Sequence, residues 1–379
     1  MSENWERVSL IELKQRTTTG TEPFAVWVQV EKNQRKTARS GKPYLEWTLR
    51  DAEDTAGIKV WDNHPHFAEA AALRTGTFIE IAGYWTTNEF GLDAKDWSLR
   101  TLDADERNEL LSGSEAMRER QERDYADITR LVNSLIDPRF RGLAQRFLEQ
   151  FGSRFRRTGA ARDYHHAWRG GLVEHTAQMM RTGEAITRTY RYLNRDLLLT
   201  GALFHDSGKL WENSFPENGF LMPYQLRGEM LGHINIGIEL VNKLWRDLME
   251  SSEAVEWRGL EPANEDVRLH LLHLVASHHG ELAFGSPVLP KTPEAIVLHH
   301  IDNIDAKLEM FRRGYEQSQE LAPGIVDKVR PLSQKLIRPL PRIVGSDASS
   351  KHLNEESPSL NVDSLLDSAD EDVKALWIR

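Results

Sequence analysis

Histidines and aspartates cluster in the second half of the chain, with 11 of the 14 histidines between His165 and His300. A lone histidine on a helix is more often a hydrogen-bonded core or surface residue than a ligand. Here imidazoles and carboxylates recur on five apolar segments of helical spacing, where buried polar groups need partners. A shared metal centre supplies such partners. The residues are His175, His205, Asp206, His233, His278, His279, Asp302 and Asp305.

The composition limits the chemistry of this site. The chain has no cysteine, which excludes disulfides, thiolate metal sites, iron–sulfur clusters and cysteine nucleophiles. Nitrogen and oxygen ligands suit Mn²⁺, Fe, Zn²⁺ or Ni²⁺, among which geometry and availability must choose. The sequence therefore predicts a site for a divalent cation.

Several residues near these motifs could hold a substrate. Lys209, four residues after His205, is placed to reach a phosphate oxygen as a point charge, the alternative being a solvated lysine. His165 and His166 precede Gly170-Gly171. These glycines could allow the backbone to approach a phosphate closely, or they could form a tight turn at the start of a helix. Ser286 could contact a terminal nucleotide or belong to a structural turn.

The elements that must position these residues change character along the chain. Over the first hundred residues, Phe24 to Val30 alternate with period 2, as in a half-buried strand. Turns are predicted at 40–43 and 54–57, strands at 24–30, 44–51, 58–61, 77–82 and 95–101, and a short helix at 67–73. Five strands with one helix between the third and fourth is the order of the OB-fold, with another small barrel or sandwich as the alternative.

Beyond residue 105 the spacing becomes helical. Helices are predicted at 128–136, 140–151, 172–190, 195–205, 233–249, 267–278 and 293–313. We therefore expect a multidomain protein, in which an N-terminal all-β OB-fold barrel is followed by an all-α helical bundle. The predicted domains are 1–105 for the barrel, 106–137 for a helical linker with Gly113 as its weak point, 138–342 for the metal domain and 343–379 for an acidic, disordered tail.

The barrel has features of a nucleic-acid-binding domain. OB-folds stack bases on aromatic side chains beside a cationic groove. Lys36 and Arg39 lie in the basic first hairpin, immediately before Tyr44 and Trp47. We expect Lys36, Arg39 and Tyr44 to contact the strand, whereas Trp47 could equally fill the barrel. Seven arginines between Arg139 and Arg162 either guide the strand or form a solvated face.

Charge and hydropathy indicate which partners and which cellular location to expect. The net charge of −10 argues against bulk electrostatic coating of nucleic acid, so any binding face must be local. No apolar run approaches the roughly 20 residues of a membrane span, and the N-terminus lacks the order of a signal peptide. We expect a cytoplasmic protein without a membrane partner, with self-assembly and a protein partner for the acidic tail as further hypotheses.

The histidine and aspartate motifs resemble those of the HD-domain phosphohydrolase superfamily. The resemblance implies that His175, His205, Asp206 and Asp302 hold one ion. In the binuclear branch, Asp206 bridges to a second ion held by His233 and His278, with His279 competing for that role. Asp305 is then an alternative to Asp302 or orients a ligand, as His299 could. The expected cofactor is two ions, Mn²⁺ before Fe, Ni²⁺, Zn²⁺ or Mg²⁺.

An OB barrel followed by such a domain is similar to the bacterial YhaM-type 3′-to-5′ exoribonucleases. The matching stretches are RSGKPYLEWTLRD, HHAWRGGLVEHT, LLLTGALFHDSGK, LGHINIG, ASHHGELAFGSPVLPKTPEA and LHHIDNIDAK. The resemblance implies a metal-dependent 3′-to-5′ exonuclease that hydrolyses single-stranded RNA, or also single-stranded DNA, to nucleoside 5′-monophosphates, with Asp206 and Lys209 in catalysis. The alternatives are a phosphohydrolase of small or cyclic nucleotides and a non-catalytic single-strand-binding adaptor. Gly-Glu-Leu-Ala-Phe after His279, in place of a GYP triplet, counts against cyclic dinucleotides.

Overall fold

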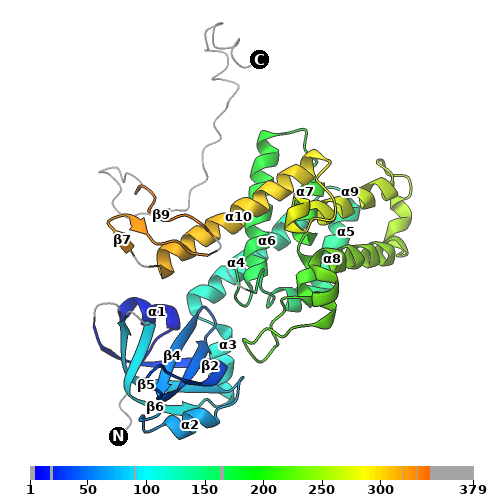
Figure 1. The fold of residues 1–379 in the computed structure, drawn as a ribbon. Helices are drawn as coiled ribbons and strands as arrows, with labels where there is room; N and C mark the ends of the chain where they lie inside the picture. Colours follow the sequence, from blue (N-terminus) through cyan, green and yellow to red (C-terminus); the bar gives the residue numbers. More distant parts are fainter. Residues whose placement is uncertain are drawn as a thin grey trace, which may run out of the picture. The chain divides into compact units, whose positions relative to one another are not determined.

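The structure is a computed structural model that describes residues 5–17, 20–88, 91–162, 166–318, 320–330 and 332–341. Its N-terminal region is built mostly of β-strands, and a helical region follows (Figure 1). None of the helices in these described ranges is both long and apolar enough to cross a membrane. The predicted tail at 343–379 and His165 lie outside the described residues.

An antiparallel sheet forms the N-terminal region. Its strands run in the order β4-β3-β2-β5-β6, and β1 pairs with β2 in parallel. The sheet path ends at β4 and β6, so an antiparallel sheet is established and closure into an OB barrel stays a prediction. The strands are β1 (Glu6–Arg7), β2 (Glu22–Thr37), β3 (Pro43–Arg50), β4 (Thr55–Trp61), β5 (Phe78–Asn88) and β6 (Gly91–Thr101), with helices α1 (Leu10–Arg16) and α2 (Phe67–Ala72).

The alternating apolar residues of the first predicted strand lie in the core of this sheet. Phe24, Val26, Val28 and Val30 on β2 are all buried, because successive side chains of a strand face opposite sides and the apolar set shares one side. Trp47 on β3 is fully buried in the same apolar cluster. Trp47 therefore fills the core and is not available for base stacking.

The turn predicted at 54–57 was wrong. The chain turns at 51–54 instead, where the Asp51 Oδ1 accepts the backbone N–H groups of Glu53 at 2.9 Å and Asp54 at 2.7 Å. An aspartate that binds the backbone two residues on makes its own turn. Strand β4 consequently begins at Thr55, and Ala56 and Ile58 point into the core.

The helical region packs around one large apolar cluster drawn from α4 to α10. Gly113, the predicted weak point, ends α3 with a φ of +73°, a backbone conformation that favours glycine. The helices are α3 (Ala104–Ser112), α4 (Glu115–Asn133), α5 (Pro138–Phe155), α6 (Gly171–Thr189), α7 (Arg195–Phe204), α8 (Leu226–Met249), α9 (Asn264–Ser277) and α10 (Pro293–Gln317). Shorter elements are η1 (Ser207–Trp211), η2 (Glu253–Trp257), η3 (Leu282–Phe284), β7 (Glu320–Ala322), β8 (Ile325–Val326) and β9 (Leu336–Ile337).

The arginine-rich segment serves the fold at several positions. Arg139 is 1% exposed and binds Asp137, the carbonyl of Pro262 and Asn264. Arg162 donates to the carbonyls of Glu212, Met222 and Pro223. Arg139 is therefore not available to guide a nucleic-acid strand, because its guanidinium is enclosed by its own chain.

Candidate metal centre

A first group of ligand atoms gathers where α6, α7 and α10 meet. The Nε2 atoms of His175 and His205 lie 3.1 Å apart. The Asp206 Oδ2 lies 3.2 Å from His205 Nε2 and 3.7 Å from His175 Nε2. The Asp302 Oδ1 lies 3.4 Å from His175 Nε2. Four side chains that are up to 127 residues apart thus face one point.

These separations fit a single ion. Two ligand atoms that each lie about 2.1 Å from an ion are about 3.0 Å apart at a right angle and about 3.4 Å apart at a tetrahedral angle. Three of the observed separations, 3.1, 3.2 and 3.4 Å, fall within this range, and the fourth, 3.7 Å, is slightly longer. The group needs little rearrangement to hold a divalent cation.

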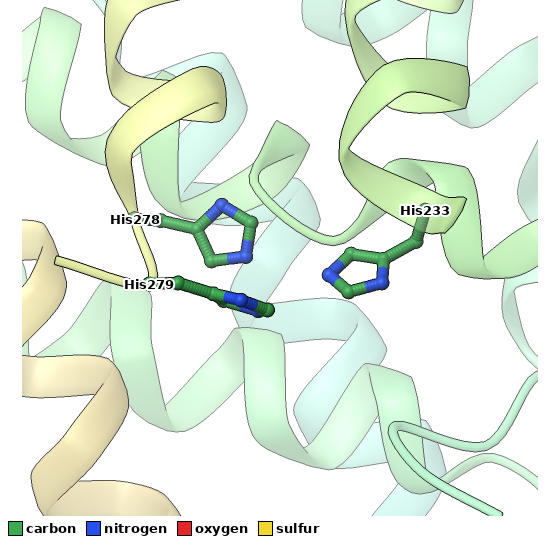
Figure 2. Close-up of side chains that lie close together, drawn as sticks. All are labelled: His233, His278 and His279. Carbon is green, nitrogen blue, oxygen red and sulfur yellow. The ribbon is translucent and has the colours of Figure 1, made fainter. Parts of the chain in front are cut away.

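A second group lies on the other oxygen of Asp206. His233 Nε2 is 3.5 Å and His278 Nε2 is 3.6 Å from Asp206 Oδ1. Figure 2 shows the rings of His233, His278 and His279 turned toward one another, His233 from α8 and the other two from the end of α9. The three histidines can each offer a nitrogen to one shared position. Asp206 is therefore common to both groups.

Three buried atoms of the second group have no hydrogen-bond partner within the described ranges: Asp206 Oδ1, His233 Nε2 and His278 Nε2. An unpaired buried polar atom costs about 1–3 kcal/mol, so three of them converging on one point call for a ligand. A cation accepts lone pairs from all three. This observation favours His278 over His279 as the ligand nearest Asp206.

Helix ends aim two of these imidazoles. His205 follows α7 and His278 follows α9, each as the C-cap residue. Each donates its Nδ1–H to a carbonyl three residues earlier, His205 to Ala202 and His278 to Val275, both at 2.8 Å. This hydrogen bond satisfies a carbonyl at the helix end and fixes the tautomer, leaving Nε2 free for a metal.

Two glycines allow His233 to lie close to Asp206. Gly232 has φ +69° and ψ 157°, so α8 breaks there and His233 opens its second part. A Cβ at Gly208 would lie 1.9 Å from the backbone oxygen of His233. Only glycine lets η1, which follows Asp206, pack this closely on α8.

A buried chain of acids and imidazoles supports the first group. Asp305 Oδ2 lies 2.6 Å from His175 Nδ1 and 3.1 Å from His166 Nε2. His166 Nδ1 in turn lies 3.8 Å from Glu174. Asp302 thus faces the ligand nitrogen of His175 and Asp305 faces the opposite nitrogen, so Asp305 orients the ring. His166, expected to hold substrate, is fully buried and faces this chain instead.

Sequence reasoning missed two carboxylates of the support. Glu212 Oε2 lies 3.1 Å from His233 Nδ1 and orients this ring as Asp305 orients His175. Glu174 is the direct neighbour of His175 and lies beside His166. Glu212 follows His205 by seven residues, which places it just past η1. An acid close after the His-Asp pair was the available signal.

The electrostatics suit metal ligation. Burial raises the pKa of Asp206, but the charge of Lys209 and the neighbouring His205 lower it well below its usual range. Burial lowers the pKa of His278 and His279. Burial also lowers the pKa of His175, but Asp302 and Asp305 outweigh it and raise the value to about 10. A positive charge between His175 and Asp302 is strongly favoured, whether a proton or a metal ion supplies it.

The remaining predicted residues of this region have clear positions. Lys209 donates from Nζ to Asp206 Oδ2 at 2.6 Å. His299 donates from Nδ1 to the carbonyl of His278 at 2.9 Å, and so supports the end of α9. Ser286 is 4% exposed and donates its hydroxyl to Val288 O at 2.7 Å. Ser286 thus takes the structural turn role and not the expected nucleotide contact.

Two of the predicted strand-binding residues, Lys36 and Tyr44, lie beside Trp61 on the N-terminal sheet. Lys36, Tyr44 and Trp61 are cross-strand neighbours on β2, β3 and β4. The rings of Tyr44 and Trp61 lie 5.2 Å apart, and Trp61 is 39% exposed. Lys36 pairs with Glu46, and Arg39 is exposed in the turn before β3. Two aromatic rings beside basic side chains are the surface that base stacking requires.

The comparison with known families bears on the helical region. Residues 172–307 match the HD domain family. The chain carries an HD domain. The match contains both groups around Asp206, whereas His166 precedes it. HD domains bind divalent metals and indicate a metal-dependent phosphohydrolase, in agreement with the unpaired buried ligand atoms.

Proposed function

We propose that this protein is a metal-dependent 3′-to-5′ exonuclease that hydrolyses single-stranded RNA, with single-stranded DNA as a second substrate to be tested. The observation that carries the proposal is the pair of ligand groups that share Asp206 within an HD domain. Water adds to the terminal phosphorus, the P–O3′ bond breaks, and O3′ takes up a proton. The released product is a nucleoside 5′-monophosphate.

The side chains of the site support this chemistry. When bound, divalent cations, Mn²⁺ in the first instance, neutralise phosphate charge and lower the pKa of water. Asp206 offers one carboxylate oxygen to each ligand group, which sets the spacing of the two positions. Lys209, next to the same carboxylate, adds a positive charge where the phosphate is expected. Asp305 and Glu212 hold His175 and His233 in fixed orientations.

The N-terminal sheet supports the choice of substrate. The rings of Tyr44 and Trp61 offer two adjacent stacking surfaces, and Lys36 and Arg39 supply nearby positive charge. Stacking on aromatic side chains tolerates any base, because every base has a π-face. We infer that this surface captures a single strand without sequence preference, whereas the HD domain performs hydrolysis.

A product ladder tests the proposal. Single-stranded RNA labelled at its 5′ end is incubated with the full chain and Mn²⁺. Progressive shortening supports the proposal, cleavage of cyclic dinucleotides alone supports the small-nucleotide alternative, and no cleavage of either supports an adaptor. Asp206→Asn is expected to abolish shortening and to keep strand binding within about twofold. Asp266→Asn, an exposed acid on α9, is the matched control and should behave as the unaltered chain.

A further inference from the structure

An exposed aromatic ring lies in the chain shortly before His233, a member of the second ligand group. Tyr224, in the segment that leads into α8, is 76% exposed. The guanidinium carbon of Arg162 lies 4.1 Å from the centre of its ring. One side of the ring therefore rests on a cation, and most of the remaining ring surface is open to solvent.

The cation behind the ring is held rigidly. Arg162 donates to Glu212 O at 2.8 Å, Pro223 O at 2.9 Å and Met222 O at 3.3 Å. Two of these carbonyls belong to the residues directly before Tyr224. The guanidinium has a fixed geometry of donors, so three carbonyl partners fix its plane. The ring of Tyr224 therefore stacks on a guanidinium whose position is fixed by its own hydrogen bonds.

A short path of contacts links this ring to the metal ligands. Glu212, whose carbonyl binds Arg162, places its carboxylate 3.1 Å from His233 Nδ1. A second exposed aromatic residue is Phe284, whose carbonyl accepts the Nδ1–H of His279 at 2.8 Å. Hydrogen bonds thus connect two segments that carry exposed aromatic residues to the histidines labelled in Figure 2.

We propose that Tyr224 is a stacking platform for a nucleobase of the strand whose phosphate lies at the metal centre. This inference rests on the proposed function. An aromatic ring backed by a guanidinium attracts the face of any base without reading its hydrogen-bonding edge. The platform holds the terminal nucleotide in line with the phosphate, so binding energy from the base orients the bond that breaks. Tyr224 accordingly favours a nucleotide with a base over the same backbone without one.

The test compares two RNA substrates that are identical except that one lacks the base of its 3′-terminal nucleotide. Tyr224→Ala is expected to lower kcat/KM on the complete RNA roughly 5- to 160-fold, the range of one lost base stack. The same variant should leave kcat/KM on the abasic RNA within about twofold. Tyr224→Trp should restore the preference for the complete RNA. Tyr192→Ala is the matched control, because Tyr192 is also 76% exposed and lies between α6 and α7.

The outcomes separate this inference from the proposed function. Hydrolysis of bis(p-nitrophenyl) phosphate by the same preparations reports on the metal centre and should be equal for all variants. Equal losses on the two RNAs, or no loss on either, overturn the platform and leave the exonuclease in place. Absence of shortening by the unaltered chain overturns both, and a loss shared by Tyr192→Ala assigns the effect to general surface change.

Discussion

Replacing Asp305 by Asn tests whether this residue orients His175 or is itself a ligand. Its Oδ2 contacts His175 Nδ1 at 2.6 Å and His166 Nε2 at 3.1 Å, on the side of His175 away from the other ligands. The amide keeps the shape of the carboxylate, and its oxygen can still accept both hydrogen bonds. It removes the negative charge that makes the imidazole a stronger ligand.

The size of the effect follows from the kind of contact. Partners behind a metal ligand typically contribute 10- to 100-fold to metal affinity or activity, which corresponds to about 1.4–2.7 kcal/mol. Hydrogen bonds to charged groups contribute about 1.5–3 kcal/mol each, and Asp305→Asn weakens two of them without removing either. We therefore expect metal affinity to fall about 10- to 100-fold, with kcat largely recovered at saturating metal.

Competition with a chromophoric chelator measures the affinity, and phosphodiester hydrolysis across a metal titration measures recovery. Glu309→Gln provides the control, since Glu309 is a buried acid one turn further along α10 that pairs with Arg312. An unchanged affinity in Asp305→Asn would refute the orienting role. A complete loss that saturating metal does not restore would make Asp305 a ligand in its own right.

Three further predictions concern the metal and the strand. Removing the metal with a chelator should lower the Tm of the protein. Adding the metal back at a hundredfold excess over its Kd should raise the free energy of unfolding by about 2.7 kcal/mol. An unchanged Tm in calorimetry would contradict a resident ion. Because the pKa of His175 is raised to about 10, metal must displace its proton, so affinity should rise with pH between 6.5 and 8.5 by up to about tenfold per unit. Isothermal titration in buffers of different ionisation enthalpy counts the released protons, and a pH-independent affinity would contradict this. Arg39→Ala should lower the slope of log K against log salt for single-strand binding by about 0.7, and an unchanged slope in fluorescence anisotropy would remove Arg39 from the binding surface.

Local patterns predicted many of the strands and helices, whereas the set of candidate ligands rested on the family resemblance. The alternation from Phe24 to Val30 predicts a buried strand face because the apolar residues recur with period 2. The helices around His175, His205 and His278 follow from apolar spacing of 3.6. Asp206 could be placed at the centre because the resemblance links residues that are distant in sequence.

Contacts between distant residues could not be predicted in the same way. His166 was assigned to substrate because it precedes a glycine pair, yet tertiary packing buries it against Asp305, 139 residues away. Arg139 stands in a run of cations, but its own partners include Pro262 and Asn264. The turn at 51–54 depends on one side chain binding its own backbone, which a pattern of turn-forming residues locates only approximately.

The buried carboxylates of the two ligand groups need a positively charged partner. Five carboxylates lie in or beside the two ligand groups: Asp206, Asp302, Asp305, Glu174 and Glu212. Within the described residues, Lys209 is the one lysine that forms an ion pair with any of them. Buried carboxylates are stable only when paired with cations or hydrogen-bond donors. Protons on histidines can balance part of this charge, but a proton has one bond to give and cannot satisfy Asp206 Oδ1 and two imidazole nitrogens together. A divalent ion can bind all three atoms at once, because it has several coordination positions. The same buried residues that would be unstable without a partner therefore favour a metal ion over a proton.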